Sequence, residues 1–340
     1  MKTEIDKILA TFSIQPILMD IGASGDPPNI WNPIACKSIY IGFDPDRREL
    51  HDVTKGKYAR SIIINEAVTS ASDQNKVHFY LTQSPYCSST LPPDTVALSH
   101  YLFSDLFVVK EEVSATASTL GAVIERLCLQ GIDWFKTDTQ GTDLRLFTSL
   151  SDDIRSRVLA VDIEPGLIDA YQGEDLFVDA HRELLRQGFW LSSLDVKGTV
   201  RMKRTTLQAM TSHRHKLKDS RICAAIRPSP GWCEARYLRT LESLSKRNAG
   251  MRDYALLWVF SMIEQQWGYA LDIAVEYNKM FGNDDIYLLL REAPLRQVRR
   301  CSLKTAWASF KSMIPMQFLG FLKKESWEKS RKHTGRHEMP

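Results

Sequence analysis

The sequence lacks long hydrophobic runs, and neither glycine nor proline is abundant. No stretch of roughly 18 uncharged apolar residues occurs, which argues against a membrane-spanning helix. The opening segment MKTEIDKILATF carries acidic residues and has no small-residue cleavage site, so it does not resemble a secretory signal and we expect a cytoplasmic protein. With 17 Gly and 14 Pro among 340 residues, the chain is neither fibrous nor of low complexity.

Closely spaced cysteine pairs are also missing. The six cysteines are scattered and never form a C-x-x-C pair, so the spacing typical of zinc and dithiol redox sites is absent and we expect no metal. In a cytoplasmic protein they would be reduced. Cys36 and Cys128 have apolar neighbours in the sequence, which predicts small buried side chains rather than nucleophiles.

Acidic charge is scarce at the C-terminal end only. Residues 291–340 hold twelve Lys and Arg against four Asp and Glu, whereas the chain as a whole has a net charge of +3. The first 290 residues are therefore mildly acidic, which argues against a nucleic-acid groove in the body of the protein.

Apolar segments of strand length alternate with helical patterns up to about residue 205. This alternation predicts an α/β fold with a mostly parallel sheet covered on both faces. The segment GFWLSSLDVKGTVRMKR has no room for a crossover helix and predicts an antiparallel hairpin at one edge of the sheet. The predicted strands are residues 17–21, 39–43, 61–65, 77–81, 107–113, 132–137, 158–163, 189–193 and 199–203.

Helical patterns alone follow from about residue 206. We therefore predict two parts: a ligand-binding α/β domain over residues 1–205 and an all-helical C-terminal region with a basic tail over residues 206–340. The best helix candidates are residues 236–246, 251–267, 269–281 and 295–313.

The first predicted strand and its turn carry the clearest chemical signal. The strand ends in Asp20, and a turn from Gly22 to Gly25 leads toward a helix, which lets the backbone approach a nucleotide-like ligand. The second strand ends in Asp44, where an acid accepts hydrogen bonds from both ribose hydroxyls.

The acids around this turn favour one cofactor class over another. A nicotinamide cofactor places its diphosphate at such a turn, where Asp20 and Asp26 would repel it. The same acids suit the cationic amino-acid end of S-adenosylmethionine. A methyl-donor site is therefore the preferred interpretation.

Several motifs, in this order, resemble the FkbM family of S-adenosylmethionine-dependent methyltransferases over roughly residues 15–205. They are DIGASG (20–25), GFDPD (42–46), NEAVTS (65–70), SST (88–90), TLGAVIE (119–125), WFKTDTQGTDL (134–144), VDIEP (161–165), and YQGEDLF with GFWL (171–177 and 188–191). Family members usually carry Asn where this chain has Ser24. The resemblance gives no role to the residues after 206.

The resemblance implies a Rossmann-like sheet of class I methyltransferases, with S-adenosylmethionine as the cofactor. By position, the methionine portion of the donor would be held by Asp20, Gly22, Ala23, Ser24 and Gly25. Asp44 would hold the ribose, and Glu66 with Ala67 the adenine edge. The segment 65–67 also fits a plain strand end and turn.

Two carboxylates are candidates for the base that an alcohol acceptor needs. Methyl transfer is an in-line displacement, and the acceptor hydroxyl must lose its proton. Asp138 lies at the carboxyl end of the strand 132–137, where open α/β sheets bind ligands, and is the first candidate. Glu164 is the second, although a structural role at its strand end is equally open. Burial would have to raise the pKa of either carboxyl to make it an effective base.

Four polar residues are candidates for contacting the acceptor. Gln140 and Lys136 come from the same motif as Asp138, and Lys136 also fits a paired strand residue. Ser88 and Ser89 lie in the loop 82–95, which fits a substrate-binding loop or a plain connection. His78 and His100 remain alternative bases.

The segment from Leu303 to Lys324 combines apolar residues at helical spacing with flanking lysines. This pattern fits an interfacial helix on an anionic membrane, giving peripheral contact at its inner face, and it also fits a helix docked on the protein.

We therefore expect a methyltransferase that acts on a hydroxyl of a sugar, glycan or natural product, with no nucleic-acid partner. A methyltransferase-like binding or scaffold protein with a degenerate donor site is the alternative. A nicotinamide-dependent oxidoreductase is disfavoured by the acidic turn. The sequence leaves the oligomeric state open.

Overall fold

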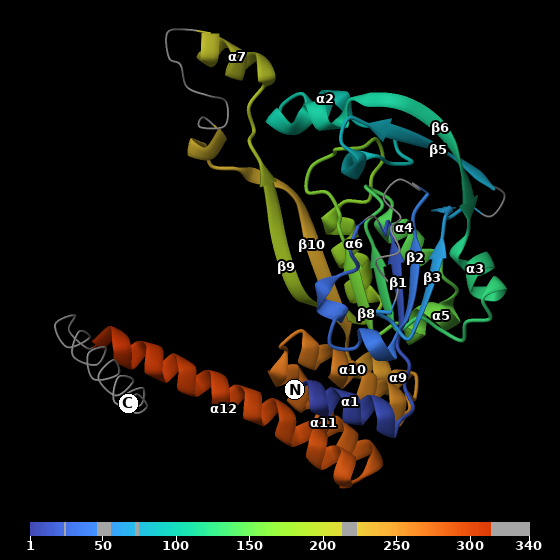
Figure 1. Ribbon diagram of the computed structural model, residues 1–340, viewed down its shortest axis with the longest axis vertical. Helices are drawn as coiled ribbons and strands as arrows, with labels where there is room; N and C mark the ends of the chain where they lie inside the picture. The colour runs from blue at the N-terminus through green and yellow to red at the C-terminus, as the bar shows by residue number, and fades with distance from the viewer. Residues whose placement is uncertain (24, 46–55, 72–74, 213–222, 314–340) are drawn as a thin grey trace, which may run out of the picture.

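A seven-stranded sheet forms the centre of the molecule in the computed structural model, which describes residues 1–23, 25–45, 56–71, 75–212 and 223–313 (Figure 1). The strand order is β3-β2-β1-β7-β8-β10-β9. The strands are β1 (Ile17–Ile21), β2 (Ile39–Phe43), β3 (Arg60–Ile64), β7 (Trp134–Thr137), β8 (Ala160–Ile163), β9 (Phe189–Thr199) and β10 (Ser229–Arg239).

Most of this sheet is parallel, as the sequence predicts. The pairs β1–β2, β2–β3, β1–β7 and β7–β8 are parallel, whereas β10 is antiparallel to both β8 and β9. Without β10, the order is the 3-2-1-4-5-6 arrangement of doubly wound sheets that bind dinucleotides. A mixed α/β fold with an antiparallel edge is therefore confirmed.

The predicted hairpin over residues 189–203 is wrong. Residues 189–199 form the single strand β9, whose partner is β10, in a register that runs from Phe189 opposite Arg239 to Thr199 opposite Ser229. The Lys197-Gly198 step continues the strand instead of turning. Pro228 and Pro230 look like a turn in the sequence but stand at the beginning of β10, where a strand tolerates proline.

The expectation of an all-helical region after residue 206 is also wrong. β10 lies inside the sheet between β8 and β9, so the sheet crosses the boundary expected near residue 205. The helices that follow are α9 (Leu241–Lys246), α10 (Met251–Ile263), α11 (Trp267–Phe281) and α12 (Asp285–Met313). α12 begins ten residues before the predicted start at 295 and contains Pro294. None of the described helices is long and apolar enough to cross a membrane.

Alternate strand residues pack into two hydrophobic cores, because successive side chains point to opposite faces of a sheet. Leu18 and Trp134 belong to one core, which α1 (Lys2–Thr11), α10 and α11 complete. Met19 and Phe135 belong to the other, which α3 (Leu120–Arg126), α4 (Asp143–Thr148) and α6 (Phe177–Arg186) complete.

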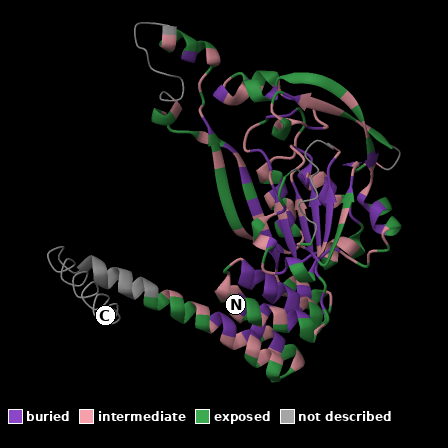
Figure 2. Ribbon diagram, viewed as in Figure 1, coloured by how far each residue is buried: buried purple, intermediate pink, exposed green. Residues whose placement is uncertain are grey.

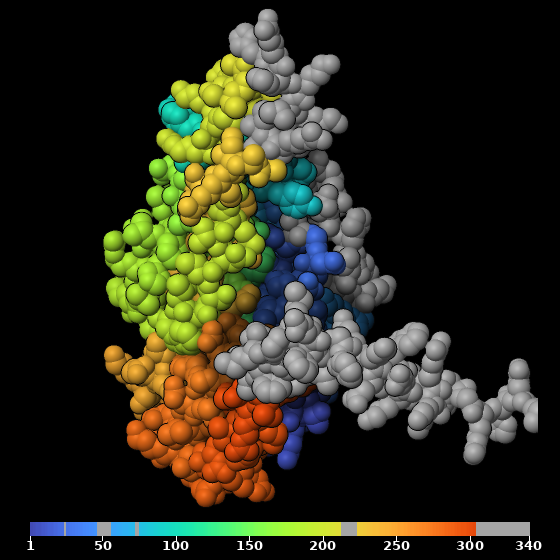
Figure 3. All heavy atoms as spheres, turned by 90° about the vertical axis from the view of Figure 1, so that its left-hand side faces the viewer, coloured from blue at the N-terminus to red at the C-terminus, as the bar shows by residue number. Residues whose placement is uncertain are grey.

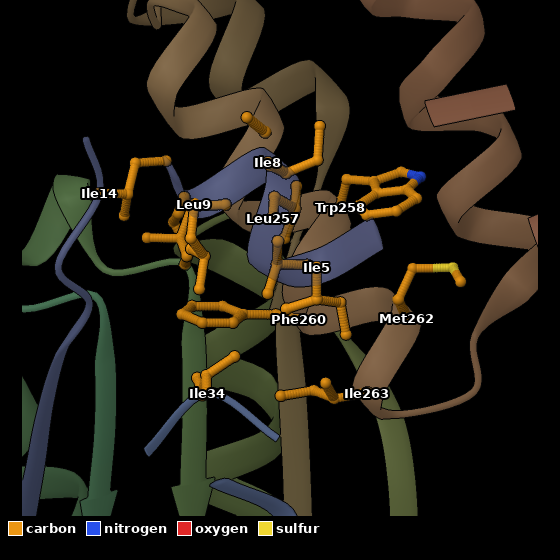
Figure 4. Close-up of a cluster of buried hydrophobic side chains, with 14 of the residues drawn as sticks. Ile5, Ile8, Leu9, Ile14, Ile34, Leu257, Trp258, Phe260, Met262 and Ile263 are labelled. Carbon is orange, nitrogen blue, oxygen red and sulfur yellow. The ribbon is translucent and has the colours of Figure 1, made fainter. Parts of the chain in front are cut away.

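α10 is the most deeply buried helix of the described chain. Every residue from Tyr254 to Ile263 is buried, which is visible as an uninterrupted buried stretch (Figure 2). The labelled side chains of the cluster around it are Ile5, Ile8, Leu9, Ile14, Ile34, Leu257, Trp258, Phe260, Met262 and Ile263 (Figure 4). Burial of each large apolar side chain contributes about 1.5–3 kcal/mol, so α10 is part of the core and no surface appendage.

A row of alternating charges crosses four strands on the same sheet face as α10. Asp20, Lys136, Asp162 and Arg236 stand opposite one another in register on β1, β7, β8 and β10. The Lys136 Nζ atom lies 2.7 Å from Asp20 Oδ1, and Arg236 Nε lies 2.7 Å from Asp162 Oδ1. We call this row the charge ladder. These four charged residues fill positions on this sheet face that would otherwise hold apolar side chains.

A second, three-stranded sheet is inserted between β3 and β7. It has the order β4-β6-β5 and lies beyond the carboxyl ends of the central strands (Figure 1). The predicted strands 77–81 and 107–113 are confirmed as strands but belong to this sheet. Its strands are β4 (Ala67–Val68), β5 (Lys76–Thr82) and β6 (Val109–Ser118), and the helices η3 (Pro85–Cys87), α2 (Thr95–Leu98) and η4 (Leu102–Phe107) lie between β5 and β6 in the chain.

The remaining elements are η1 (Asn29–Trp31), η2 (Ala35–Lys37), α5 (Asp152–Arg157) and α7 (Arg204–Ser212). The space-filling view shows α7 in yellow near one end of the molecule and the C-terminal helices in orange at the other (Figure 3). Cys36 and Cys128 are exposed, so their predicted burial is wrong; Cys128 follows α3 with a positive φ of 52°.

Candidate functional site

A cavity of about 510 Å³ opens at the carboxyl ends of the parallel strands. Ile21 and Phe43 at the ends of β1 and β2, Asp138 after β7 and Glu164 after β8 all line it. β1 lies between β2 and β7, so this is the point where the order of the sheet reverses, and open α/β sheets bind their ligands there. Residues of η3, η4 and the segment 166–174 complete the wall.

The glycine turn after β1 forms one side of the cavity. Gly22 has a φ of +79°, and a Cβ atom there would stand 2.0 Å from the carbonyl oxygen of Asp138, so only glycine fits. The amides of Gly22 and Ala23 both donate to the carbonyl of Phe43, at 3.0 and 2.9 Å. The turn therefore fixes β1 against β2 and Asp138 against β1. Ser24 lies outside the described residues.

The predicted residues Gly22, Asp44, Glu66 and Ala67 all line the cavity. Asp44 is 5% exposed and follows β2 directly. Glu66 accepts a short hydrogen bond from Ser118 and forms an ion pair of 3.1 Å with Arg126. Both contacts lower the pKa of its carboxyl. The structure thus brings these four residues together from three strand ends. Their roles in binding a donor stay predictions.

Other predicted residues do not reach the cavity. Asp20, Ala23 and Gly25 are not among the described residues that line it. Asp20 is 2% exposed and binds Lys136 and the hydroxyl of Tyr40 in the charge ladder. Burial opposes the charge of Lys136, but Asp20 and Asp138 raise its pKa above the usual range. Lys136 is not a described lining residue either, so a structural role fits both partners better than contact with a ligand.

The predicted acceptor side centres on Asp138 and Gln140. Gln140 Nε2 donates to Asp138 Oδ1 at 2.7 Å, and the Tyr171 hydroxyl donates to Gln140 Oε1 at 3.1 Å. Ser89 Oγ donates to the Gln140 carbonyl at 2.7 Å, so Ser89 positions Gln140 and does not itself line the cavity. These contacts hold Gln140 at a positive φ of 57°. Ser88 lines the cavity, and its hydroxyl accepts from the amide of Thr82 at 3.1 Å.

Glu164 lies next to Asp138 in the cavity wall. Burial, the negative charge of Asp138 and a hydrogen bond with it raise the pKa of Glu164 well above the usual range. Glu164 therefore keeps its proton near neutral pH. Asp138 and Glu164 follow the two strands that the sequence singles out. Together they form a hydrogen-bonded pair of carboxyl groups in which Glu164 holds a proton.

The structure adds residues to which the sequence analysis gives no role. Glu174 lines the cavity, and burial raises its pKa to about 7. Phe103 of η4 and Trp232 of β10 face each other with ring planes 8° apart and centroids 6.2 Å apart. Tyr171 and Glu174 lie in the YQGEDLF motif, which offered a signal. Trp232 offered none, because its place depends on the long-range pairing of β10.

The charged side chains that the structure places in the cavity wall are all carboxylates, and Glu164, which keeps its proton, adds no charge near neutral pH. The five carboxyl-bearing residues of the cavity are Asp44, Glu66, Asp138, Glu164 and Glu174, and no Lys, Arg or His is among the described lining residues. His78 is exposed, and neither it nor His100 lines the cavity. An acidic wall repels a diphosphate and attracts a cationic ligand.

Comparisons with protein-family models, with curated proteins and with solved structures found no match for the chain.

Proposed function

We propose that the protein is an S-adenosylmethionine-dependent methyltransferase of the FkbM type. The observation that carries the proposal is the cavity at the switch point of the sheet, lined by five carboxyl groups and by no basic side chain of the described chain. S-adenosylmethionine carries a sulfonium and an ammonium group, and both are stabilised by an acidic surrounding. The mostly parallel sheet with an antiparallel edge also agrees with the resemblance.

The residues present fit the donor part by part. Asp44, nearly buried at the end of β2, stands where an acid accepts hydrogen bonds from ribose hydroxyls. Glu66 and Ala67, where the chain passes from β3 to β4, border the space for the adenine edge. Gly22 lines the cavity next to Asp138, whose backbone packs directly on it, and the methionine portion would pass along this turn.

The donor supplies a methyl group on a sulfonium, and the chain supplies position and a proton acceptor. Gln140, held by Ser89 and Tyr171, orients the carboxylate of Asp138. Glu164 keeps its proton because its pKa is raised, which leaves Asp138 to accept the proton of the acceptor hydroxyl. The second sheet and η4 partly enclose the cavity, which limits access of water.

The acceptor that fits this wall is a hydroxylated compound such as a sugar, a glycan or a natural product. Phe103 and Trp232 offer aromatic surface for the apolar face of a ring, and Asp138, Glu164 and Glu174 offer oxygen atoms for hydroxyl groups.

Isothermal titration calorimetry of the full chain with S-adenosylmethionine, S-adenosylhomocysteine and NADH tests donor binding. We expect both adenosyl ligands to bind and NADH not to bind. Asp44→Ala should weaken the affinity for S-adenosylhomocysteine about tenfold or more through the lost ribose contacts. The matched control is Asp195→Ala, an exposed aspartate on β9 outside the cavity, which should bind as the wild type does. Absence of adenosyl binding, or full affinity in Asp44→Ala, would contradict the assignment.

Transfer of a labelled methyl group tests the reaction once an acceptor is found. Asp138→Asn should lower kcat about 100-fold or more, because the amide cannot accept the hydroxyl proton, while the affinity for S-adenosylhomocysteine, whose sulfur is uncharged, should stay nearly unchanged. An unchanged kcat would exclude Asp138 as the base.

A further inference from the structure

A second cavity lies at the opposite end of the central sheet, where the parallel strands begin. It is an open depression of about 640 Å³, bordered by α5, the C-terminal end of α6, the end of β10 and α9. Arg239 ends β10, and Gly188 directly precedes β9, so this cavity borders the amino ends of the parallel strands. The candidate methyl-donor site is at their carboxyl ends. We call this second site the cationic cavity.

Positive side chains dominate the cationic cavity. Two carboxylates, Asp152 and Glu242, also line it. Three hydroxyl residues, Ser156, Thr240 and Ser243, add hydrogen-bond donors to the wall. The basic residues that line it are Arg155, Arg186, Arg239, Lys246 and Arg247.

Arg239 is the deepest of these cations. It is 2% exposed, and its guanidinium donates to the carbonyls of Arg155, Val158 and Gln187 at 2.7, 2.8 and 2.6 Å. Burial and the charges of Arg247 and Arg155 lower its pKa to about 9, and no carboxylate of the described chain pairs with it. A guanidinium has five N–H groups, so these three bonds leave donors over.

The other guanidinium groups are paired with carboxylates, but the positive charge of the cationic cavity as a whole is not balanced. Arg155 pairs with Asp152, Arg186 with Glu183, and Arg247 with Asp253. Lys246 is exposed at the rim and forms no ion pair in the part of the chain that the structure describes. Arg239 and Lys246 therefore contribute positive charge that Glu242 alone cannot balance.

We propose that the cationic cavity binds the phosphate group of a small anion. Guanidinium groups present paired N–H donors that match two oxygens of a phosphate, and a concave wall with hydroxyl donors completes its hydrogen bonds. A phosphate group compensates the positive charge of Arg239 and Lys246 that Glu242 leaves unbalanced. The cationic cavity and the methyl-donor cavity lie at opposite ends of the parallel strands, so the ligand of the cationic cavity is a second molecule. The inference therefore does not depend on the proposed function.

Calorimetry of the full chain with sodium phosphate and sodium pyrophosphate tests the proposal. We expect binding that weakens as sodium chloride is raised, because ion pairing near a surface is screened by salt. Lys246→Gln should weaken phosphate binding about tenfold, whereas Lys246→Arg should retain it. The matched control is Arg182→Gln, an exposed cation on α6 outside the cavity, which should bind as the wild type does.

Two results would overturn the proposal. One is no heat of binding for either anion with the wild-type chain. The other is an equal loss of affinity in Lys246→Gln and Arg182→Gln, which would indicate a general charge effect. Thermal unfolding of each variant checks that it is folded, and because Lys246 is exposed we expect its replacement to leave the fold intact. Sedimentation with phosphatidylcholine vesicles that contain phosphatidic acid separates a lipid headgroup from a soluble phosphate as the source of the ligand.

Discussion

Gly22 shows at the scale of one residue how the turn after β1 sets the cavity. Gly22 and Gly25 both have a φ near +80°, so alanine at either position costs about 1 kcal/mol of backbone strain. Only at Gly22 would the new methyl group meet backbone, the carbonyl oxygen of Asp138. We therefore expect Gly22→Ala to lower the free energy of unfolding by about 3 kcal/mol more than Gly25→Ala, measured by urea denaturation. Equal losses would contradict the close approach of this turn to Asp138.

Glu174 links one residue to the pH dependence of stability. Burial raises its pKa from 4.5 to about 7, so the folded protein holds a proton that the unfolded chain releases. The free energy of unfolding should therefore fall as pH rises from about 4.5 to about 7. Glu174→Gln should remove up to about 2 kcal/mol of that loss and be more stable than the wild type at pH 8. Thermal unfolding of both proteins at pH 5 and pH 8 measures the difference, and parallel pH profiles would contradict the raised pKa.

The charge ladder shows at the scale of strands how two predicted site residues, Asp20 and Lys136, are paired with each other. Asp20 and Lys136 lie opposite each other on β1 and β7, with the Asp20 side chain almost fully buried. Removal of one partner leaves a buried charge without compensation. Lys136→Met should therefore lower the free energy of unfolding by about 3 kcal/mol, and the double variant with Asp20→Asn should recover part of it. Chemical denaturation measures both, and S-adenosylhomocysteine affinity should stay near that of the wild type. A large loss of ligand affinity in folded Lys136→Met would return this residue to the binding site.

β10 decides at the scale of the whole molecule which part of the chain can fold. A fragment of residues 1–205 lacks β10, which lies between β8 and β9, and α10, which fills one core. We expect this fragment to show no cooperative thermal unfolding. A fragment of residues 1–301 keeps the described members of both cores, of which Ala293 is the last, and should unfold cooperatively. A cooperative transition in the shorter fragment would support the boundary expected near residue 205.

The sequence predicts well what depends on local patterns. The strands 17–21 and 39–43 have the observed bounds because each is a short apolar run before a turn or an acid. Motif order also placed Asp138 and Glu164 at one end of the sheet. The predicted hairpin fails because the Lys197-Gly198 step is compatible with both a turn and a strand, and only pairing with β10, some 30 residues away, decides between them.

Local sequence patterns do not predict which face of the sheet a site residue occupies or which residues it contacts. Lys136 and Asp138 are two residues apart in one motif, yet Lys136 points into the charge ladder, whereas Asp138, one residue beyond the strand, lines the cavity. Trp232 reaches the cavity only because β10 crosses the sheet. Such placements follow from long-range register, which a single sequence does not specify.

The structure of the protein bound to S-adenosylhomocysteine tests the central claim most directly. The account predicts the ligand in the cavity at the carboxyl ends of β1, β2 and β7, with its ribose hydroxyls on Asp44 and its sulfur atom facing Asp138 and Glu164. A ligand bound elsewhere, or an adenosyl group whose ribose makes no contact with Asp44, would contradict it.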